Sequence, residues 1–384
     1  MAGGVSRRAA SCCSAGTTEV SETRRWVLVT DGGHGGSRDC VAAVRALHAG
    51  GYRSAVTVSP GTSPAAVSRY SRRRIPVPHV AQDGYVDALR GEFERGSYLT
   101  VVCASEASLR ALGEAGLHLT DKTKLNEAAR ATGIDIPMSR TFTSWREVLA
   151  ESESFTYPLV VKPAVRTFSA LRVDAPERLR ALDLDDGEIV IQEWIEDGLH
   201  ALSGVMWRGH LVAATAERWL RIWPTDCGLA SAAVTVASDP VLEDKLERLL
   251  EDYEGVFCAQ FAGTRLIDLN LRVHSSHSLS VAAGVNLVAT HCDLLNDMPV
   301  PRMRARVGFF YRWLEGDLRH VVQASRSGAM SRASAVKALL PHRGAAHSSE
   351  SLRDPGPLVS RLIYGAGRVR MPPEQRAQGR SETG

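Results

Sequence analysis

The alternation of apolar and polar side chains between residues 257 and 272 is the clearest structural signal in the sequence. Apolar residues occupy odd positions on both sides of Gly263-Thr264, at Phe257, Ala259, Phe261, Ile267, Leu269 and Leu271. Successive side chains of a strand point to opposite faces, so the segment predicts two strands joined by a tight turn. A loop with an odd number of residues would keep every apolar residue on one face, whereas a two-residue loop would break that match.

The polar face of this hairpin carries Gln260, Asp268, Asn270 and Arg272. Mg²⁺ prefers oxygen ligands and usually takes about one or two carboxylates together with substrate phosphates. Asp268 supplies a carboxylate, Gln260 and Asn270 supply neutral carbonyl oxygens, and the Arg272 guanidinium can bind a phosphate oxygen. These residues indicate a magnesium and phosphate site. The alternative is an ordinary half-buried hairpin whose polar face is solvated.

The first hundred residues alternate between short apolar segments and helical patterns. Apolar segments at 26–30 and 55–58 flank a glycine-containing loop and a helix with its apolar residues at 41, 44 and 47. A third apolar segment follows at 98–103. This order predicts a parallel sheet with covering helices. The glycines of residues 31–37 do not have the spacing of a dinucleotide-binding loop, so they predict a tight turn.

The remaining pattern predicts a mixed α and β region. Gly133 would end the first of its helices, which Asp121 or Thr120 can cap, and Arg208-Gly209 would join two strands in a hairpin. We expect helices at 121–132, 239–254, 286–299 and 309–324, and strands at 157–163, 188–195, 202–207 and 211–215.

Composition is ordinary for a protein of two or three globular domains, with 384 residues, 44% hydrophobic and 23% charged. A net charge of +3 does not indicate nucleic acid or a membrane as the main partner. The seven cysteines are scattered without zinc-like spacing, which favours a reduced, cytoplasmic setting. The first 24 residues lack the apolar core of a secretory signal; a disordered tail is expected there, with a transit segment as the alternative.

Four segments, taken in order, resemble the ATP-grasp superfamily, and within it the carbamoyl-phosphate-synthetase-like and carboxylate–amine ligase branch. They are residues 121–125 with Gly133 and Pro137 downstream, residues 158–163, residues 192–195 before Gly198, and Gln260 with residues 268–272 leading to 283–286. The resemblance covers residues 26 to 320, and its strength lies in the order of motifs that are individually weak.

The resemblance implies an α/β and α+β fold, with a Rossmann-like pre-ATP-grasp N-terminal domain followed by a two-lobed ATP-grasp domain. The expected segments are a disordered tail (1–24), the Rossmann-like domain (25–118), the ATP-grasp domain (119–300), a helical segment (301–325) and a mostly disordered tail (326–384).

The resemblance also implies an ATP- and Mg²⁺-dependent ligase that activates a carboxylate as an acyl phosphate for attack by an amine. Lys122 and Lys162 would contact the nucleotide phosphates, and Arg272 would stabilise charge on the γ-phosphate or the acyl phosphate. Gln260, Asp268 and Asn270 would bind magnesium.

The nucleoside would lie against the segment after the second lysine strand. Trp194 and Ile195 would hold the adenine, with Glu193 beside the base, and Glu196 or His200 would meet the ribose hydroxyls. A solvated strand end is the alternative for these acidic residues.

The substrate side would include Arg218 and Arg221, which can pair with a carboxylate. Cys227, in the turn that follows them, is interpreted as a small turn residue because no His/Asp partner pattern supports a nucleophile. His274 and His277 are interpreted as surface or hydrogen-bonded residues.

The chain departs from the family pattern in three places. Gln260 stands where Glu is most common, although the synthetase-like branch also has Gln there, and Asp268 stands where Glu is usual. The loop after Lys162, residues 164–170, contains no glycine, whereas glycine amides normally cover the phosphates there. Arg166 and Ser169 could substitute as phosphate contacts.

These departures leave a second hypothesis open, a nucleotide-binding ATP-grasp relative with weak or lost catalysis. A third, nucleic-acid binding, rests only on the basic cluster 69–74, which more commonly forms a solvated face. No membrane partner is expected, and the family often forms homodimers.

Overall fold

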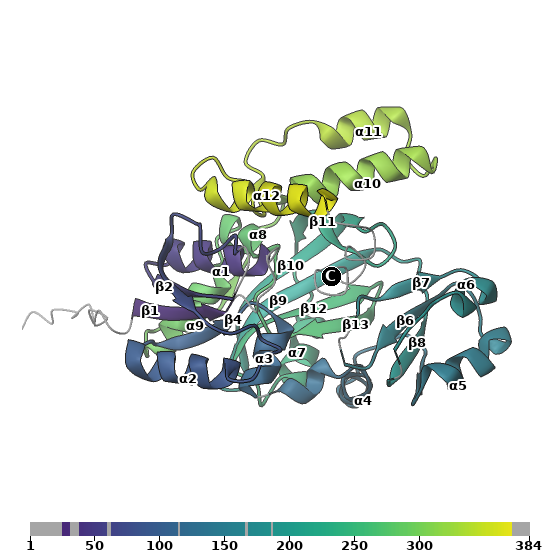
Figure 1. The fold of residues 1–384 in the computed structure, drawn as a ribbon, viewed down its shortest axis with the longest axis horizontal. Coiled ribbons are helices and arrows are strands. Elements are labelled where there is room, and N and C mark those ends of the chain that lie inside the picture. Colours follow the sequence, from purple (N-terminus) through teal and green to yellow (C-terminus); the bar gives the residue numbers. More distant parts are fainter. Residues whose placement is uncertain are drawn as a thin grey trace, which may run out of the picture.

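The computed structural model describes residues 25–30, 38–59, 63–113, 116–165, 168–185 and 187–370. The predicted N-terminal tail, the glycine loop at 31–37, Arg166 and residues 371–384 lie outside these ranges. The described residues form three sheets, and Figure 1 shows the N-terminal sheet on one side of a large central sheet and a small lobe on the other.

The N-terminal sheet is parallel throughout, as the alternation of apolar segments and helices predicted. Its strand order is β3-β2-β1-β4, formed by β1 (Trp26–Thr30), β2 (Arg53–Val58), β3 (Ser71–Pro76) and β4 (Thr100–Cys103). The helices of this unit are α1 (Arg38–Ala49), α2 (Tyr85–Gly96) and α3 (Glu106–Leu112). The predicted apolar side of α1 is fully buried and packs against α8 and α9.

The small lobe is an antiparallel sheet of order β5-β8-β6-β7. Its elements are β5 (Ser139–Phe142), α5 (Trp145–Ala150), β6 (Leu159–Pro163), β7 (Leu171–Val173), α6 (Pro176–Arg180) and β8 (Ile189–Glu193). Its core joins residues of β6 and β8 to Trp145, Val148 and Leu179 of the two helices. The lobe therefore has a hydrophobic core of its own.

The large sheet has the order β13-β12-β9-β10-β11-β15-β16, with β14 paired to β10. Its strands are β9 (Leu199–Trp207), β10 (His210–Trp223), β11 (Leu229–Val236), β12 (Gly255–Ala262), β13 (Arg265–Asn270), β14 (Met303–Arg304), β15 (Phe310–Arg312) and β16 (Ala346–His347). Arg208 and Gly209 join β9 to β10 with φ of 50° and 76°. Positive φ at both turn residues is the signature of a type I′ turn, and the hairpin itself is the one that the sequence predicted.

The β12–β13 hairpin corrects the prediction of an odd-numbered loop. Ala262 pairs with Arg265, so the loop has two residues, Gly263 and Thr264, and Phe261 pairs with Leu266. A β-bulge at Ile267 then restores the alternation, because Gln260 pairs with Asp268. The extra residue of a bulge shifts one strand by one position. Leu266, 1% exposed, therefore replaces Ile267 in the apolar face.

Helices cover the apolar face of the large sheet. α4 (Lys122–Ala131), α7 (Pro240–Leu249) and α3 contribute to one core with the apolar side chains of β12 and β13. The Asp121 carboxylate caps α4 by accepting a hydrogen bond from the Thr123 amide at 2.9 Å, and Gly133 follows the helix with φ of 73°. The other two helices of this part are α8 (His277–Ala282) and α9 (Leu287–Leu295).

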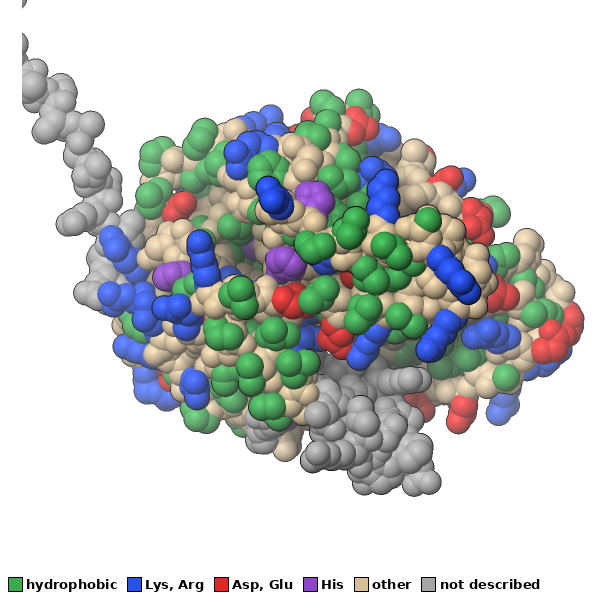
Figure 2. Space-filling model, turned by 90° about the horizontal axis from the view of Figure 1, so that it is seen from above, with side chains coloured by type: hydrophobic (Ala, Val, Ile, Leu, Met, Phe, Trp, Pro, Cys, Tyr) green, Lys and Arg blue, Asp and Glu red, His purple; other side chains and the backbone are tan. Residues whose placement is uncertain are grey.

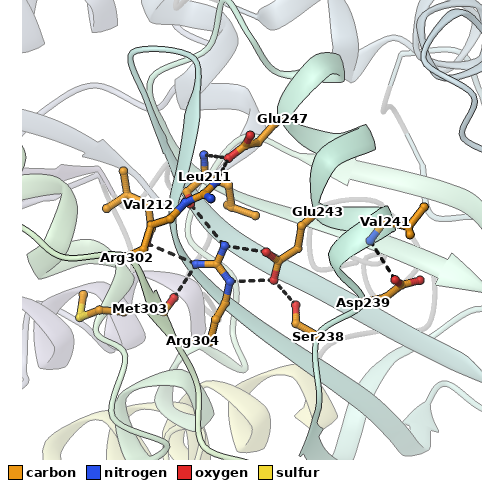
Figure 3. Close-up of polar contacts among 10 residues, drawn as sticks. All are labelled: Leu211, Val212, Ser238, Asp239, Val241, Glu243, Glu247, Arg302, Met303 and Arg304. Carbon is orange, nitrogen blue, oxygen red and sulfur yellow. Dashed lines mark hydrogen bonds and ion pairs between the residues drawn. The ribbon is translucent and has the colours of Figure 1, made fainter.

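Strand β14 is held against β10 by ion pairs with α7 (Figure 3). The Arg304 guanidinium binds both carboxylate oxygens of Glu243 at 2.7 and 2.6 Å, and Arg302 pairs with Glu247. Both arginines also donate to the carbonyl of Leu211, where β10 begins. These contacts fix the chain that returns from α9 to the sheet.

The C-terminal part differs from the prediction in two places. Residues 310–312 form β15 rather than the start of a helix, and residues 326–370 are not disordered but contain α11 (Arg332–Leu339), β16 and α12 (Gly356–Arg370) after α10 (Leu314–Arg326). Asp354, which is 1% exposed, ties this segment to the N-terminal unit, because its carboxylate accepts hydrogen bonds from Arg45 and Ser68. A composition rich in serine and arginine does not reveal such distant partners.

The outer surface of these C-terminal helices is mixed. Figure 2 shows apolar and basic side chains side by side on this face. The exposed apolar residues of the three helices are Leu314, Leu318, Val322, Val336, Leu339, Val359, Leu362 and Ile363. Within the described ranges, no helix has the length and apolar character needed to cross a membrane.

Candidate active site

The strand register brings polar side chains of four strands onto one face of the large sheet. One row across the strands consists of Asp268, Gln260, Ala201 and Glu217, which are paired in that order. The neighbouring row on the same face consists of Asn270, Cys258, Ser203 and Thr215. We call these two rows the polar face. Gln260, Asp268 and Asn270 therefore share one side of the sheet, as the sequence predicted.

Two lysines from different parts of the chain reach the Asp268 end of the polar face. Lys122, the first residue of α4, forms an ion pair with the Asp268 carboxylate. Lys162, in β6 of the small lobe, donates to Gln192 Oε1 at 2.7 Å and to the carbonyl of Ile267 at 3.0 Å. The two lysines and Asp268 thus meet where the small lobe contacts the hairpin.

The environment of Lys162 lowers its pKa to about 8. Burial is the largest cause, because it penalises the ammonium form, and the nearby Lys122 acts in the same direction. The Asp268 carboxylate opposes both. An anion with several charges, such as a triphosphate, would favour the protonated form of both lysines.

Asp268 is the acidic member of the predicted magnesium set. Asn270 donates its side-chain amide to Asp268 Oδ2 at 2.9 Å, which leaves the amide oxygen of Asn270 as its ligand atom. No group of three or more His, Cys, Asp or Glu residues suited to a metal occurs in the part of the chain that the structure describes. One carboxylate with two amide oxygens fits Mg²⁺ that takes its remaining ligands from phosphates.

Arg272 lies just beyond β13, on the side of the hairpin that meets the N-terminal unit. Its guanidinium pairs with Asp39 in the first turn of α1 and donates to the carbonyl of Val273 at 3.0 Å. Its Nε is buried without a hydrogen-bond partner among the described residues. Arg272 is thus held close to the hairpin, and its Nε is free to donate to a ligand.

The predicted adenine segment follows β8. The Glu193 carboxylate accepts from the Met138 amide at 2.9 Å and lies 3.8 Å from the Arg265 guanidinium. The Arg172 guanidinium lies over the Trp194 ring, 4.3 Å from the ring centroid. The Trp194 Nε1 donates a hydrogen bond to the exposed Glu196 carboxylate at 2.8 Å. Ile195 is partly buried.

His200 and Arg218 lie on the opposite side of the sheet from the polar face. They pair with each other across β9 and β10, in the row next to Ala201 and Glu217. Adjacent rows point to opposite faces, so neither side chain is directed toward Asp268. His200 stacks on the Phe261 ring at 5.1 Å, and burial lowers its pKa.

Arg221 is committed to another partner. It binds the fully buried Asp317 of α10 through both carboxylate oxygens, and Arg312 donates to the same carboxylate at 2.7 Å. The structure therefore corrects the assignment of Arg218 and Arg221 to the substrate side. The sequence of a strand gives the spacing of its side chains, but it does not reveal that Arg221 pairs with Asp317, which lies far away in the chain.

Cys227, of the predicted turn, is partly buried, and its burial raises the pKa of the thiol to about 11. A nucleophilic cysteine needs a lowered pKa, so the thiol supports the turn-residue interpretation.

Sequence reasoning missed the second acidic side chain of the polar face, Glu217. It is the one acidic residue in the apolar segment 211–217, and it is 1% exposed. Ser276 donates to its carboxylate at 2.9 Å and contacts His274 Nδ1 at 2.9 Å. A single acidic residue within a predicted buried strand was the available signal.

The fold is similar to several solved structures, although no protein-family model and no curated protein matches the sequence. An L-amino acid ligase from Bacillus licheniformis is 17% identical, with a TM-score of 0.52 over 71% of this chain and 74% of that chain. A carboxyaminoimidazole ribonucleotide synthase from Aspergillus clavatus, complexed with ATP, is 17% identical, with a TM-score of 0.56 over 75% and 81%.

A biotin carboxylase from Campylobacter jejuni is also similar, at 14% identity and a TM-score of 0.53 over 72% of each chain. Identities this low establish the fold and not the reaction. The mixed parallel and antiparallel sheets, the small lobe and the central sheet agree with the architecture that the sequence motifs predicted. The chain therefore shares the fold of these solved structures, which agrees with the architecture that the resemblance to ATP-grasp enzymes implied.

Proposed function

We propose that this protein is an ATP- and Mg²⁺-dependent ligase that activates a carboxylate as an acyl phosphate for attack by an amine. The observation that carries the proposal is the meeting of Lys122 and Lys162 with Asp268, which lies on one face with Gln260 and Asn270. Two cations and one carboxylate from three separate elements suit a triphosphate with its metal.

The nucleotide would lie between the small lobe and the hairpin. Lys122 and Lys162 bind the phosphates, and residues 193–196 contact the adenine and ribose. The low pKa of Lys162 supports this role, because burial penalises its ammonium form and a bound phosphate would stabilise that form. Binding the phosphates would exchange the Gln192 and Ile267 contacts for stronger charged ones.

Gln260, Asp268 and Asn270 would hold magnesium, which neutralises phosphate charge when bound. Arg272 stabilises the anionic oxygens of the transferring phosphoryl group, using a guanidinium that Asp39 holds in position. The chain's own contribution is thus mainly to position the phosphates and balance their charge.

The reaction is tested by incubating the protein with Mg-ATP, hydroxylamine and a panel of carboxylic acids that includes the common amino acids. We expect ADP and phosphate to appear only with a suitable carboxylate, together with its hydroxamate. Release of AMP and pyrophosphate would contradict the acyl phosphate route.

A second candidate is a nucleotide-binding protein with lost catalysis, favoured by the glycine-free segment 164–170 after Lys162. It predicts tight Mg-ATP binding in a calorimetric titration without ADP release for any carboxylate in the panel. Glycine substitutions at Ala164 and Val165 that create ATP turnover would support it, because backbone amides could then approach the phosphates.

A further inference from the structure

Glu217 is a buried carboxylate without a cationic partner. It is 1% exposed, its Oε1 accepts from Trp219 Nε1 and from Ser276 Oγ, both at 2.9 Å, and its Oε2 has no hydrogen-bond partner among the described residues. Both donors are neutral. A buried carboxylate normally has a cation or a full set of hydrogen bonds around it. The Oε2 atom of Glu217 has neither, so it is a candidate for binding a ligand.

The titratable groups around Glu217 do not supply the missing charge. They come from three surrounding segments: Cys258 of β12, Tyr311 of β15 and His274 after β13. Burial raises the pKa of Cys258 and of Tyr311 to about 12 each and lowers the pKa of His274 well below its usual value. All three are neutral at pH 7. The two guanidiniums of this region have other partners: Arg38 donates to the Tyr311 hydroxyl at 3.4 Å, and Arg272 pairs with Asp39.

Glu217 lies in the same row as the proposed metal ligands. Ala201 separates it from Gln260 across β9, and Asp268 is one strand further. Strands are about 4.8 Å apart, so Glu217 lies roughly 10 Å from Gln260 along the sheet. The side chains between the two ends are small: Ala201, Ser203 and Cys258. These side chains are themselves only 1–2% exposed, so a substrate that extends from the phosphate end to Glu217 has to part the elements that cover this face.

We propose that Glu217 is the amine subsite of this protein, where its carboxylate binds the ammonium group of the acceptor substrate and takes a proton from it. The inference rests on the proposed ligase function and names the chemical class that the second substrate carries. An ammonium group suits this place because the buried Oε2 is an acceptor without a hydrogen-bond partner among the described residues, and the two donors to Oε1 are neutral.

The proton transfer completes the chemistry of amide formation. One proton of the ammonium group passes to Glu217 Oε2, which leaves the nitrogen with a lone pair. The nitrogen then bonds to the acyl carbon while the bond from that carbon to the phosphate oxygen breaks. The second proton leaves with the phosphate.

The carboxylate is suited to this exchange. Burial raises the pKa of Glu217 to about 7, while the bonds from Trp219 and Ser276 oppose the rise. A general base whose pKa lies near the working pH both accepts and releases a proton readily. Ser276 is a positioning residue, because it holds Oε1 while its oxygen also contacts His274 Nδ1.

The test compares two small nucleophiles on wild type and Glu217→Gln, with the carboxylate that gives the largest hydroxamate yield in the panel. Hydroxylamine is largely neutral near pH 7.5, whereas ammonium chloride supplies a cation. We expect the ratio of kcat/KM for ammonium to kcat/KM for hydroxylamine to fall about 100-fold in Glu217→Gln, the scale of losing one partner of a buried charge pair. Glu153→Gln, at an exposed carboxylate, should leave the ratio unchanged.

Each outcome has a separate meaning. A wild-type protein that forms no hydroxamate contradicts the ligase proposal itself. An unchanged ratio in Glu217→Gln, with both nucleophiles retained or both lost equally, overturns the amine subsite. Glutamine keeps the shape and accepts the same two hydrogen bonds, so we expect Glu217→Gln to unfold at the same temperature as wild type or higher, since a buried uncompensated charge is removed.

Discussion

The two ends of the polar face hold acidic side chains in opposite electrostatic states. Asp268, at the β13 end, pairs with the Lys122 ammonium and accepts from Asn270. Glu217, on β10, lies in the same row but receives only neutral donors. The Asp268 end therefore has two lysines that can bind further negative charge. The Glu217 end has a carboxylate that can bind a cation.

The difference follows from the elements that reach each end. The Asp268 end lies at the sheet edge, where α4 and the small lobe bring Lys122 and Lys162. The Glu217 end lies in the middle of the sheet, with its contacts from a loop that supplies Ser276 and His274. A phosphorylated acyl group suits the first end and an ammonium group suits the second, so the face has the polarity that joining a carboxylate to an amine requires.

Removing the charge at the first end should have the largest effect. Asp268→Asn keeps the shape of the side chain but leaves the Lys122 ammonium without its carboxylate and the proposed metal without its one anionic ligand. We expect carboxylate-dependent ADP release to fall about 1000-fold, as for the loss of a central charge in phosphoryl transfer. Steady-state assays across a range of magnesium concentrations measure it.

Asp135→Asn is the matched control, because this exposed carboxylate accepts from Thr264 at the tip of the same hairpin. It should behave as wild type. Normal turnover by Asp268→Asn would show that the Asp268 end does not bind the reacting phosphates.

A buried charge outside the polar face should affect stability instead. Asp317→Ala leaves Arg221 and Arg312 facing each other without their shared carboxylate. Removing one partner of such a buried group destabilises a protein by about 3 kcal/mol. We expect this loss in the free energy of unfolding measured with urea. The exposed Glu153→Ala should show no measurable change.

If Asp317→Ala keeps its stability but loses activity, Arg221 belongs to the substrate site after all, as its position in the sequence suggested.

Replacing Lys162 should have a smaller effect than replacing Asp268, because Lys122 would still contact the phosphates in a Lys162 variant. For Lys162→Met we expect the dissociation constant of Mg-ATP to rise about 100-fold, the loss of a strong charged contact in a partly buried site. Calorimetric titration measures it. Lys124→Ala, on the exposed side of α4, should bind ATP like wild type. Equal binding by the two variants would remove Lys162 from the proposed site.

The pH dependence of nucleotide binding should be the smallest of these effects. With a pKa of about 8, Lys162 is mostly charged at pH 7 and mostly neutral at pH 9. Because ATP binds the charged form, its affinity should fall about tenfold between these pH values, with proton uptake on binding above pH 8. Lys162→Arg stays charged, so its affinity should be flat over this range. A flat wild-type profile would contradict the role of Lys162.

The hairpin shows how far the sequence alone leads. Alternation correctly placed Gln260, Asp268 and Asn270 on one face, because the period of a strand is a property of the backbone. It could not choose between an odd loop and a two-residue loop with a bulge, because both restore the same alternation. The bulge at Ile267 became visible only from the pairing of β12 with β13.

The arginines show the complementary failure. Motif spacing placed Arg218 and Arg221 near the substrate, but strand pairing turned Arg218 to the opposite face and Asp317 bound Arg221. The partner of Arg221 lies about a hundred residues away in the chain, and the sequence contains no local sign of it. Glu217 was missed for the same reason, because its importance depends on which neighbours leave it without a cation.

The sequence by itself determined many of the periodic elements and the order of the motifs, and hence the predicted two-lobed architecture, because these depend on local backbone geometry and on burial of apolar side chains. Only the tertiary structure decided which charges meet. Electrostatic partners are set by the packing of elements distant in the chain, and that packing gave Asp268 a lysine and left Glu217 with neutral donors.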